Sequence, residues 1–564
     1  MLPYTKTQTE QERRHCLMIE NQCYHRYYPG SESAVCVCNS GHCDLIEPFL
    51  PEETSENRAV AYVSSKTGLR MEKRTLTWTR TVDDEQHDAN DDDKEDDEEL
   101  QAVVEDEDDL GEADEEDAKF FCCTVTVHPN QKRQTILGFG GAFTDAAGIN
   151  LASLPQNLQR SLLSSYFSRG EDGIGYSLAR VPIASTDFSE QIYSYDSYPG
   201  DFHLQNFSLY RADHDFKIPF IKLAQEIAGG ADKFRLFASP WSAPGWMKTN
   251  GRQPGRGFLK GQTTGPYYRT WADYFVRFLD AYKRDGIEFW AVTAQNEPTS
   301  GYLPGYPWQT MGFSWNSQKD FIKWSLGPRL RQAGHGNVQI IILDDSRFAL
   351  PWWSNVVLGD KETRQYVGGV GVHWYQNWVP AFVLDLTHYA NRDKFILATE
   401  ACNGANLMGS EKGPILGSWY RAELYAADII TNLHHHVAGW VDWNMALNMS
   451  GGPTWIGNVV DSPILVNASD HEFLKQPMFY AMGHFSKFIP ANSTRVSADT
   501  PWWQFGSFDA AAVVTPTGRR VAVLLNRKSR AITATLLDDT RRGQRLRVPM
   551  PARSLVTVLW GTPS

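Results

Sequence analysis

Two glutamates follow short apolar runs in the sequence and could act together on one bond. The run 289–296 leads into Glu297 and Pro298, and because proline cannot donate to a sheet ladder, the strand should end just past Glu297. A second run, 395–399, leads into Glu400 in the same way. In a parallel α/β barrel the carboxyl ends of the strands carry the chemistry. Two carboxylates at two strand ends are the minimum that glycoside hydrolysis requires, and the pattern predicts that chemistry.

The elements that position these carboxylates alternate between short apolar runs and amphipathic helical stretches. Eight βα units in about 310 residues match a (β/α)8 TIM barrel, an α/β fold. The eight strand candidates lie around 137–143, 176–182, 234–239, 290–296, 338–343, 370–374, 395–399 and 438–444.

Polar and aromatic side chains stand at nearly all of the predicted strand ends. Tryptophan rings suit the apolar face of a sugar, and carboxylates and amides suit its hydroxyl groups. Any single tryptophan could instead belong to the core, but eight successive ends of this character favour a polyhydroxylated ligand. In chain order the ends offer Asp145, Arg180, Asp187, Trp241, Asn296, Glu297, Asp344, Asp345, Arg347, His373, Trp374, Tyr375, Glu400, Asp442, Trp443 and Asn444.

The chain is too long for one compact core, so several domains are expected. Strand patterns return after Ser493, and we expect them to pack with the strands that precede the barrel, as an immunoglobulin-like β-sandwich. A small antiparallel β-domain should complete the molecule. The predicted ranges are 1–47 and about 446–477 for the small domain, 48–134 and 493–564 for the sandwich, and 135–445 and about 478–492 for the barrel.

Four cysteines crowd the N-terminal stretch: Cys23, Cys36, Cys38 and Cys43. Such a group indicates either two disulfides or a zinc site. The Cys-x-Cys spacing is unlike that of zinc knuckles and favours disulfides, which imply an oxidising compartment. Four glycosylation sequons agree with that compartment, at Asn206, Asn448, Asn467 and Asn492.

Charge is distributed unevenly along the chain. The segment 83–117 holds 22 acidic residues and one lysine, a local charge of −21, so the rest of the chain carries +8 of the net −13. We expect the acidic segment to be a disordered insertion in a hairpin, with docking of a basic partner as the alternative. The mildly basic remainder suits an anionic lipid surface. No signal peptide, transmembrane run or nucleic-acid-binding array is visible in the sequence.

Long ordered motifs give the chain a close resemblance to the glucosylceramidases of glycoside hydrolase family 30. The resemblance extends from about Cys23 to the end, apart from the acidic insertion. It is carried by 138–147, 180–189, 238–251, 289–298, 372–375, 399–402, 439–444, 451–455, 458–463, 475–480 and 483–490.

The resemblance implies a retaining β-glucosidase that hydrolyses glucosylceramide to glucose and ceramide, with Glu400 as nucleophile and Glu297 as acid/base. We expect no cofactor and no metal. The resemblance also implies work on anionic membranes, a saposin-type activator, and a lysosomal (lumenal, membrane-peripheral) or secreted location. Two carboxyls as close as a retaining mechanism needs cannot both ionise cheaply, so we expect an acidic pH optimum. The alternatives are a retaining glycosidase of β-glucan or β-xylan, and a silent glycan-binding or trafficking protein.

The resemblance also implies which side chains bind the sugar. Asn296 should bind the 2-hydroxyl group, Asp187, Trp241 and Trp443 the outer hydroxyls, and Asn458 should assist from a loop.

Three further polar residues are implied around the two glutamates. Arg180 should be a partner of Glu400, Tyr375 a gate and hydrogen-bond donor, and His373 a substrate-site residue. The alternative for Arg180 is an ordinary buried ion pair, and for Tyr375 simple core packing.

The sequence departs from the family pattern in three places. Gln295 stands where a close relative has a carboxylate and could shift the pH optimum, Thr186 replaces a cysteine, and the acidic insertion has no counterpart. Asp344 with Arg347 is interpreted as a salt bridge at the barrel rim. Cys402 is interpreted as a buried thiol. The run 434–436 of three histidines cannot close on one metal ion, because adjacent helical residues point in different directions.

Overall fold

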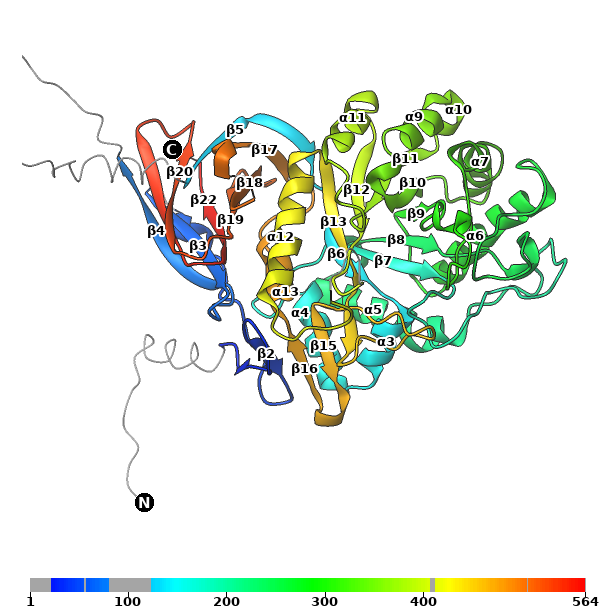
Figure 1. Ribbon diagram of the computed structural model, residues 1–564, viewed down its shortest axis with the longest axis horizontal. Coiled ribbons are helices and arrows are strands. Elements are labelled where there is room, and N and C mark those ends of the chain that lie inside the picture. Colours follow the sequence, from blue (N-terminus) through cyan, green and yellow to red (C-terminus); the bar gives the residue numbers. More distant parts are fainter. Residues whose placement is uncertain (1–21, 55–56, 81–122, 406–410, 505, 563–564) are drawn as a thin grey trace, which may run out of the picture.

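The computed structural model describes residues 22–54, 57–80, 123–405, 411–504 and 506–562. The acidic segment 83–117 and two of the eight cysteines, Cys16 and Cys122, lie outside the described residues. The described chain forms a (β/α)8 barrel, a nine-stranded β-structure and a small five-stranded sheet (Figure 1).

Eight parallel strands close into the barrel in the order β10-β11-β12-β13-β6-β7-β8-β9. All eight strands predicted from the sequence are confirmed. Their apolar side chains are buried on both faces, as expected for a parallel sheet surrounded by helices. The strands are β6 (Gly138–Ala142), β7 (Leu178–Ile183), β8 (Arg235–Pro240), β9 (Ala291–Thr293), β10 (Gln339–Ser346), β11 (Val367–His373), β12 (Phe395–Glu400) and β13 (Val437–Asn444).

Helices surround the barrel, and α6 (Pro266–Arg284) shows why these segments form. It begins at a proline, which suits the first helical turn, and buries Trp271, Phe275, Phe278 and Tyr282 on one face. The other α-helices are α3 (Asp145–Ala152), α4 (Gln156–Phe167), α5 (Ile218–Ala228), α7 (Trp315–Phe321), α8 (Gly327–Gln332), α9 (Trp352–Gly359), α10 (Lys361–Arg364), α11 (Phe382–Ala390), α12 (Trp419–His434) and α13 (Pro477–Ser486).

Strands from before and after the barrel form one hydrogen-bonded set in the order β17-β18-β19-β22-β3-β4-β21-β20-β5. The C-terminal β22 pairs with β3, so that Trp560 lies opposite Ala59. Trp560 and Trp78 pack in a core of their own, separate from that of the barrel. The strands are β3 (Arg58–Ser65), β4 (Glu72–Arg80), β5 (Thr124–Thr135), β17 (Thr494–Asp499), β18 (Phe508–Val514), β19 (Arg520–Asn526), β20 (Ile532–Asp538), β21 (Gln544–Met550) and β22 (Ser554–Trp560).

The small sheet joins the N-terminal strands to a hairpin that follows the barrel. Its order is β1-β2-β16-β15-β14, and all pairs are antiparallel except β14–β15, which is parallel and departs from the predicted antiparallel arrangement. The strands are β1 (His25–Arg26), β2 (Val35–Cys38), β14 (Ala446–Asn448), β15 (Ile464–Asn467) and β16 (Glu472–Lys475).

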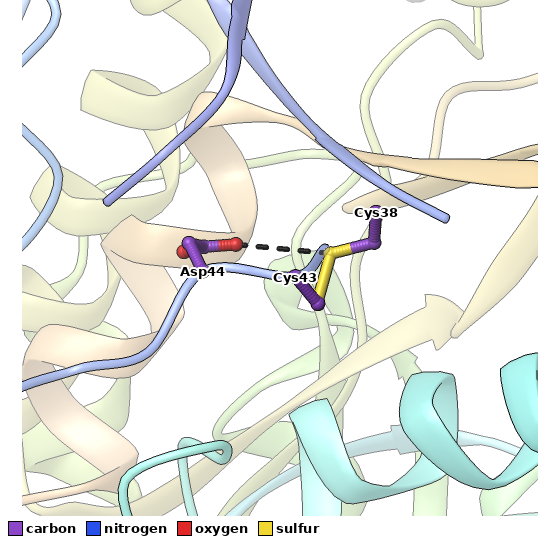
Figure 2. A group of neighbouring side chains, drawn as sticks. All are labelled: Cys38, Cys43 and Asp44. Atoms are coloured by element: carbon purple, nitrogen blue, oxygen red, sulfur yellow. Dashed lines mark hydrogen bonds between the residues drawn. A yellow bond between two sulfur atoms is a disulfide. The ribbon is translucent and has the colours of Figure 1, made fainter. Parts of the chain in front are cut away.

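Two disulfides, Cys23–Cys36 and Cys38–Cys43, fix the N-terminal strands of this sheet. Figure 2 shows Asp44 beside the second disulfide, 3.8 Å from the Cys38 sulfur. The three side chains are close enough for metal ligands, but the sulfurs are bonded to each other and are not thiolates. The Asp44 carboxylate instead accepts a hydrogen bond from Tyr480 Oη and pairs with Lys475 of β16. The disulfide prediction is therefore confirmed over the zinc alternative.

Within the described ranges, no helix combines the length and the apolar composition that crossing a membrane would require.

Candidate active site

Glu297 and Glu400 meet at the carboxyl ends of their strands. Glu400 ends β12, and Glu297 follows β9 by four residues in a backbone conformation with φ of 42°. A hydrogen bond from the backbone N–H of Glu297 to the Asp344 carbonyl (2.8 Å) holds it beside the next strand. One side-chain oxygen of each glutamate lies within 4.8 Å of the other. Carboxyls about 5 Å apart match a retaining glycosidase, whereas an inverting enzyme separates them by roughly 6.5–9.5 Å.

Arg180 of β7 connects four of the groups that surround these carboxylates. Its guanidinium contacts the Glu400 carboxylate and donates to Asn296 Oδ1 (2.9 Å), Asp344 Oδ2 (2.8 Å) and Ser239 Oγ (3.0 Å). Burial alone would lower the pKa of Arg180, but the charges of Asp344 and Glu400 outweigh it and raise that pKa. Arg180 therefore stays charged and holds four strand ends at fixed positions around one planar group.

Asp344 at the end of β10 is the fixed negative charge of the site. It accepts from Thr399 Oγ1 (2.6 Å) and His373 Nε2 (3.0 Å) as well as from Arg180. Burial would raise the pKa of Asp344, but Arg180 and His373 outweigh it and hold the pKa below its usual range. Leu343 and Asp344 both have positive φ, and the pairing of β10 with β11 shifts register there. This local distortion accompanies the inward position of the carboxylate.

His373 at the end of β11 links Asp344 to Glu297. Its Nε2 lies 3.0 Å from Asp344 and its Nδ1 3.3 Å from Glu297 Oε1. Burial would lower the pKa of His373, but the charge of Glu400 and the two carboxylate hydrogen bonds raise it to about 10. At physiological pH the ring is therefore an imidazolium that donates to both carboxylates.

Each catalytic candidate also accepts a hydrogen bond from a tyrosine. Tyr375 Oη donates to Glu400 Oε1 (2.7 Å), and Tyr306 Oη donates to Glu297 Oε2 (3.0 Å). Glu400 thus faces a guanidinium and a hydroxyl, and Glu297 faces an imidazolium and a hydroxyl. Donors of this kind stabilise negative charge on both carboxyls.

A third carboxyl, Asp187, stands after β7 and accepts from Asn458 Nδ2 (2.8 Å). Burial, with smaller contributions from the charges of Glu400 and Glu297, raises the pKa of Asp187 to about 7, although Asn458 opposes the shift. Asp345 beside the site has its pKa raised to about 6 by burial and by Glu297. The site therefore gains negative charge as the pH rises toward neutrality.

Trp241 and Trp443 pack against each other and over Arg180. Their rings stack with centroids 5.0 Å apart, and the Arg180 Cζ lies 4.9 Å and 5.5 Å from the two centroids. Both tryptophans are buried. The structure gives them a packing role around the guanidinium, and their contact with a sugar remains a proposal.

The buried thiol of Cys402 lies 3.3 Å from Tyr375 Oη. Burial raises the pKa of Cys402 well above its usual value, so the group is a thiol and not a second nucleophile.

Glu297, His373 and Glu400 lie close enough together to suggest three metal ligands. His373 donates through both ring nitrogens, however, and so offers a metal no lone pair. Arg180 places a positive charge against Glu400. This donor set fits proton and sugar chemistry better than it fits a cation.

The histidine run at the end of α12 also divides its contacts among several partners. His434 Nε2 lies 2.7 Å from the Ala510 carbonyl, and His435 Nδ1 lies 2.8 Å from Asp385. His436 stacks on His388 with ring centroids 3.9 Å apart. The three rings do not converge on a common point.

The interpretation of Asp344 and Arg347 as a rim salt bridge is wrong. Asp344 turns inward to Arg180 and His373, and Arg347 donates to the carbonyl oxygens of Val379 (2.7 Å) and Asn377 (2.6 Å).

Two other strand-end carboxyls also lack direct contacts with the glutamates. Asp145 binds Ser189 and Tyr193 and pairs with Lys217, and Asp442 accepts from Tyr425.

Sequence reasoning missed Tyr306 and Thr399 as members of the site. Thr399 immediately precedes Glu400 and could have been suspected from that position. Tyr306 lies in an irregular loop after β9, and no periodic pattern indicates where such a side chain points. Gln295 is buried and donates to the Trp241 carbonyl (2.8 Å), and its Oε1 has no hydrogen-bond partner among the described residues.

The four sequon asparagines differ in exposure. Asn206 and Asn492 are exposed, whereas Asn448 and Asn467 are half-buried. Asn467 Nδ2 donates to Asp470 (2.8 Å) and Glu472 (3.0 Å). Glycosylation at all four sites stays a prediction, and the geometry favours the two exposed ones.

Two family descriptions match nearly all of the chain after residue 135. "Glycosyl hydrolase family 30 TIM-barrel domain" matches residues 136–489, and "Glycosyl hydrolase family 30 beta sandwich domain" matches residues 492–558. The first match alone covers more than half of the chain.

Curated relatives match over almost their whole length. "Putative glucosylceramidase 3" of Caenorhabditis elegans is 42% identical over 96% of this chain and 95% of its own. "Lysosomal acid glucosylceramidase" of Mus musculus is 42% identical over 94% of each chain. Among solved structures, SrfJ from Salmonella typhimurium is 26% identical with a TM-score of 0.75, covering 90% of this chain and 100% of its own.

Proposed function

This chain belongs to glycosyl hydrolase family 30, and from that membership we propose that it is a retaining β-glucosidase that hydrolyses glucosylceramide to glucose and ceramide. The observation that carries the mechanism is the approach of Glu297 and Glu400 to within 4.8 Å, each with its own set of donors. The observation that carries the substrate is the 42% identity to two relatives named glucosylceramidase.

In the first step a Glu400 oxygen attacks C1 of the glucose ring and the bond to the ceramide oxygen breaks. Glu297 transfers its proton to that oxygen, so ceramide leaves as an alcohol and a glucosyl ester remains on Glu400. In the second step Glu297 takes a proton from water, the water oxygen bonds to C1, and free Glu400 is regenerated.

The donors around each glutamate suit these changes in charge. His373 and Tyr306 stabilise the carboxylate that Glu297 becomes as it gives up its proton. Arg180 and Tyr375 hold Glu400 in one orientation as an ionised nucleophile. Because Glu297 must hold a proton at the start, the mechanism favours mildly acidic conditions.

Around the sugar we assign the remaining predicted residues as ligands. Asn296 Oδ1 accepts a hydrogen bond from Arg180, which leaves Asn296 Nδ2 to donate to the 2-hydroxyl group. Asp187, with Asn458, and the edges of Trp241 and Trp443 would bind the outer hydroxyls.

The substrate would lie in an anionic membrane, and a saposin-type activator would help to present it. The name of the mouse relative supports a lysosomal location, and the two disulfides fit an oxidising compartment. Hydrolysis of a β-glucan or β-xylan is the alternative that the relatives support less.

The test compares wild type with Glu297→Gln and Glu400→Gln on a fluorogenic β-glucoside and on glucosylceramide in phosphatidylserine vesicles. Loss of the acid/base should lower the rate about 10²–10⁴-fold, and loss of the nucleophile at least as much. Glu226→Gln, an exposed carboxyl outside the site, is the control. Variants as fast as wild type would refute the mechanism, and a wild type that cleaves polymeric glucan but not glucosylceramide would refute the substrate.

A further inference from the structure

The segment that joins β9 to Glu297 leaves the sheet ladder before it reaches the acid/base. β9 ends at Thr293, and the φ of 42° at Glu297 is a conformation that residues other than glycine keep only where their surroundings enforce it. The backbone N–H groups of Ala294 and Glu297 donate to carbonyls of β10 (3.0 and 2.8 Å). That of Asn296 donates to the Pro240 carbonyl at the end of β8 (2.9 Å). The position of Glu297 therefore depends on individual hydrogen bonds to two neighbouring strands.

The side chain of Gln295 adds a further connection on the β8 side of this segment. Gln295 is fully buried, and its Nε2 donates to the Trp241 carbonyl just after β8 (2.8 Å) and to the Asn296 carbonyl (3.0 Å). The Asn296 carbonyl belongs to the peptide group that joins Asn296 to Glu297. One amide thus links the end of β8 to the peptide that immediately precedes the acid/base.

An amide suits this position because both of the groups that it contacts are acceptors. Its nitrogen carries two N–H donors, one for each carbonyl. Gln295 Oε1 has no hydrogen-bond partner among the described residues, so toward that part of the chain the side chain acts only as a donor. An ionised carboxylate here would place an oxygen against two carbonyl oxygens, and a protonated carboxyl could donate only one bond. The amide therefore maintains both bonds at any pH.

Trp241, at the other end of this link, is fixed by contacts of its own. Its ring stacks on Trp443 with centroids 5.0 Å apart, and the Arg180 Cζ lies 4.9 Å from its centroid. Because these contacts do not involve Gln295, Trp241 should keep its place when the amide is lost. The amide thus transmits the fixed position of the β8 end to the peptide before the acid/base, and not the reverse.

We propose that Gln295 is a positioning residue: its amide holds Glu297 where the carboxyl can pass its proton to the leaving oxygen. The proposal rests on the proposed function, because proton transfer by Glu297 is part of that function. Gln295 would touch neither the sugar nor the reacting atoms and would act through the Asn296–Glu297 peptide. A misplacement of about 1 Å can cost about 10²-fold in rate, so small displacements of this peptide should be measurable.

The first variant, Gln295→Met, keeps the length of the side chain and removes both donors. Protonation by Glu297 matters most when the leaving group is a poor one, such as an alkyl alcohol, and least when it is an acidic phenol. We expect kcat/KM to fall about 100-fold on octyl β-glucoside and less than about five-fold on dinitrophenyl β-glucoside. The activity that remains on the second substrate also shows that the variant is folded.

The matched control is Gln134→Met at the opposite end of the barrel. Gln134 Nε2 also donates to two carbonyls, those of Leu433 (2.7 Å) and Val437 (3.0 Å), and its Oε1 also has no partner in the described chain. This variant should equal wild type on both glucosides. The proposal is overturned if Gln295→Met keeps wild-type kcat/KM on octyl β-glucoside, if it loses activity equally on both substrates, or if Gln134→Met shows the same difference between them.

The second variant, Gln295→Glu, tests whether the N–H donors matter or only the shape of the side chain. Burial favours the protonated form of a carboxyl at this position, and that form can donate one of the two bonds. On octyl β-glucoside, Gln295→Glu should therefore exceed Gln295→Met in acid and lose that advantage as the carboxyl ionises. Equal rates for the two variants at every pH would show that donation is irrelevant and would overturn the proposal.

Hydrogen exchange tests the positioning without any substrate. The loss of one hydrogen bond corresponds to about a ten-fold change in a local opening equilibrium, so the N–H groups of Asn296 and Glu297 should exchange about ten-fold faster in Gln295→Met than in wild type or Gln134→Met. Faster exchange in a protein that cleaves no β-glucoside would refute the proposed function and leave the positioning intact. Unchanged exchange in a protein that does cleave would overturn the assignment of Gln295 alone.

Discussion

Of two histidines at the two ends of the barrel, one is positively charged and the other is neutral. His373 ends β11 at the catalytic end and lies between Asp344 and Glu297, and its pKa is raised to about 10. His434 ends α12 beside the β-sandwich, where its Nδ1 accepts from Arg495 Nη2 (2.6 Å) and its Nε2 donates to the Ala510 carbonyl (2.7 Å). Burial and the charge of Arg495 lower the pKa of His434 to about 4.

Burial lowers the pKa of both histidines, and the charges beside each ring decide whether that effect prevails. Both rings lose most of their water, and burial acts in the same direction on both. Carboxylates make one a permanent cation that can stabilise developing negative charge. Burial and the charge of Arg495 keep the other neutral, although its hydrogen bond to the Ala510 carbonyl opposes that shift. The histidine at the catalytic end is therefore charged, and the histidine at the opposite end is neutral.

Removal of the catalytic-end cation should have the largest effect. His373→Gln can still donate one hydrogen bond, but it loses the positive charge between Asp344 and Glu297, so kcat/KM on a fluorogenic β-glucoside should fall about 10²–10³-fold. His203→Gln, at an exposed position, should leave kcat/KM unchanged. If His373→Gln folds normally and keeps wild-type kcat/KM, the ring serves only packing.

This charge pattern was only partly predictable from the sequence. The strand ends were predictable, because apolar runs bounded by polar residues are local features of a sequence. Glu297 and Glu400 each directly follow such a run. The position of Asp344 was not. Arg347 is its near neighbour in sequence, but positive φ at Leu343 and Asp344 turns the carboxylate to Arg180, which comes from a strand more than 160 residues earlier.

The charge states of the histidines depend on such distant partners even more strongly. The sequence near His434 does not predict its contact with Arg495 of β17, since the contact arises only when the sandwich packs against α12. The run of three histidines has a pattern, but its function depends on the surfaces it meets. Local patterns therefore identified the elements, and tertiary packing determined the electrostatics.

The second effect should appear in the pH dependence of the stability. Asp187 at the catalytic end has its pKa raised by burial from its ordinary value of 3.8 to about 7, so the folded protein keeps a proton that the unfolded chain loses. The wild type should therefore lose stability as the pH rises from about 4 to 7, by at most about 4 kcal/mol. Asp187→Asn should lack this slope in urea unfolding, and Asp215→Asn, an exposed carboxyl, should keep it. Parallel wild-type and Asp187→Asn curves would show that the carboxyl is ionised throughout.

His434 should give a smaller slope of the opposite sign. Its folded pKa of about 4 lies below its ordinary value of 6.5, so the unfolded chain takes up a proton between those values while the folded protein does not. The free energy of unfolding should therefore fall as the pH drops from 6.5 to 4. The loss should be about 2 kcal/mol, less than the full pKa shift would give, because the ring is partly exposed.

His434→Gln tests this slope, since glutamine can donate to Ala510 and accept from Arg495 without titrating. The free energy of unfolding of the variant should be close to that of wild type at pH 7 and exceed it in acid, measured by urea unfolding at each pH. A variant that loses stability equally at every pH would show that the ring matters for its shape alone. Opposite slopes from Asp187 and His434 would instead show that one chain offsets acid destabilisation at its domain interface with acid stabilisation at its catalytic end. Such a balance suits an enzyme whose acid/base must hold a proton to work.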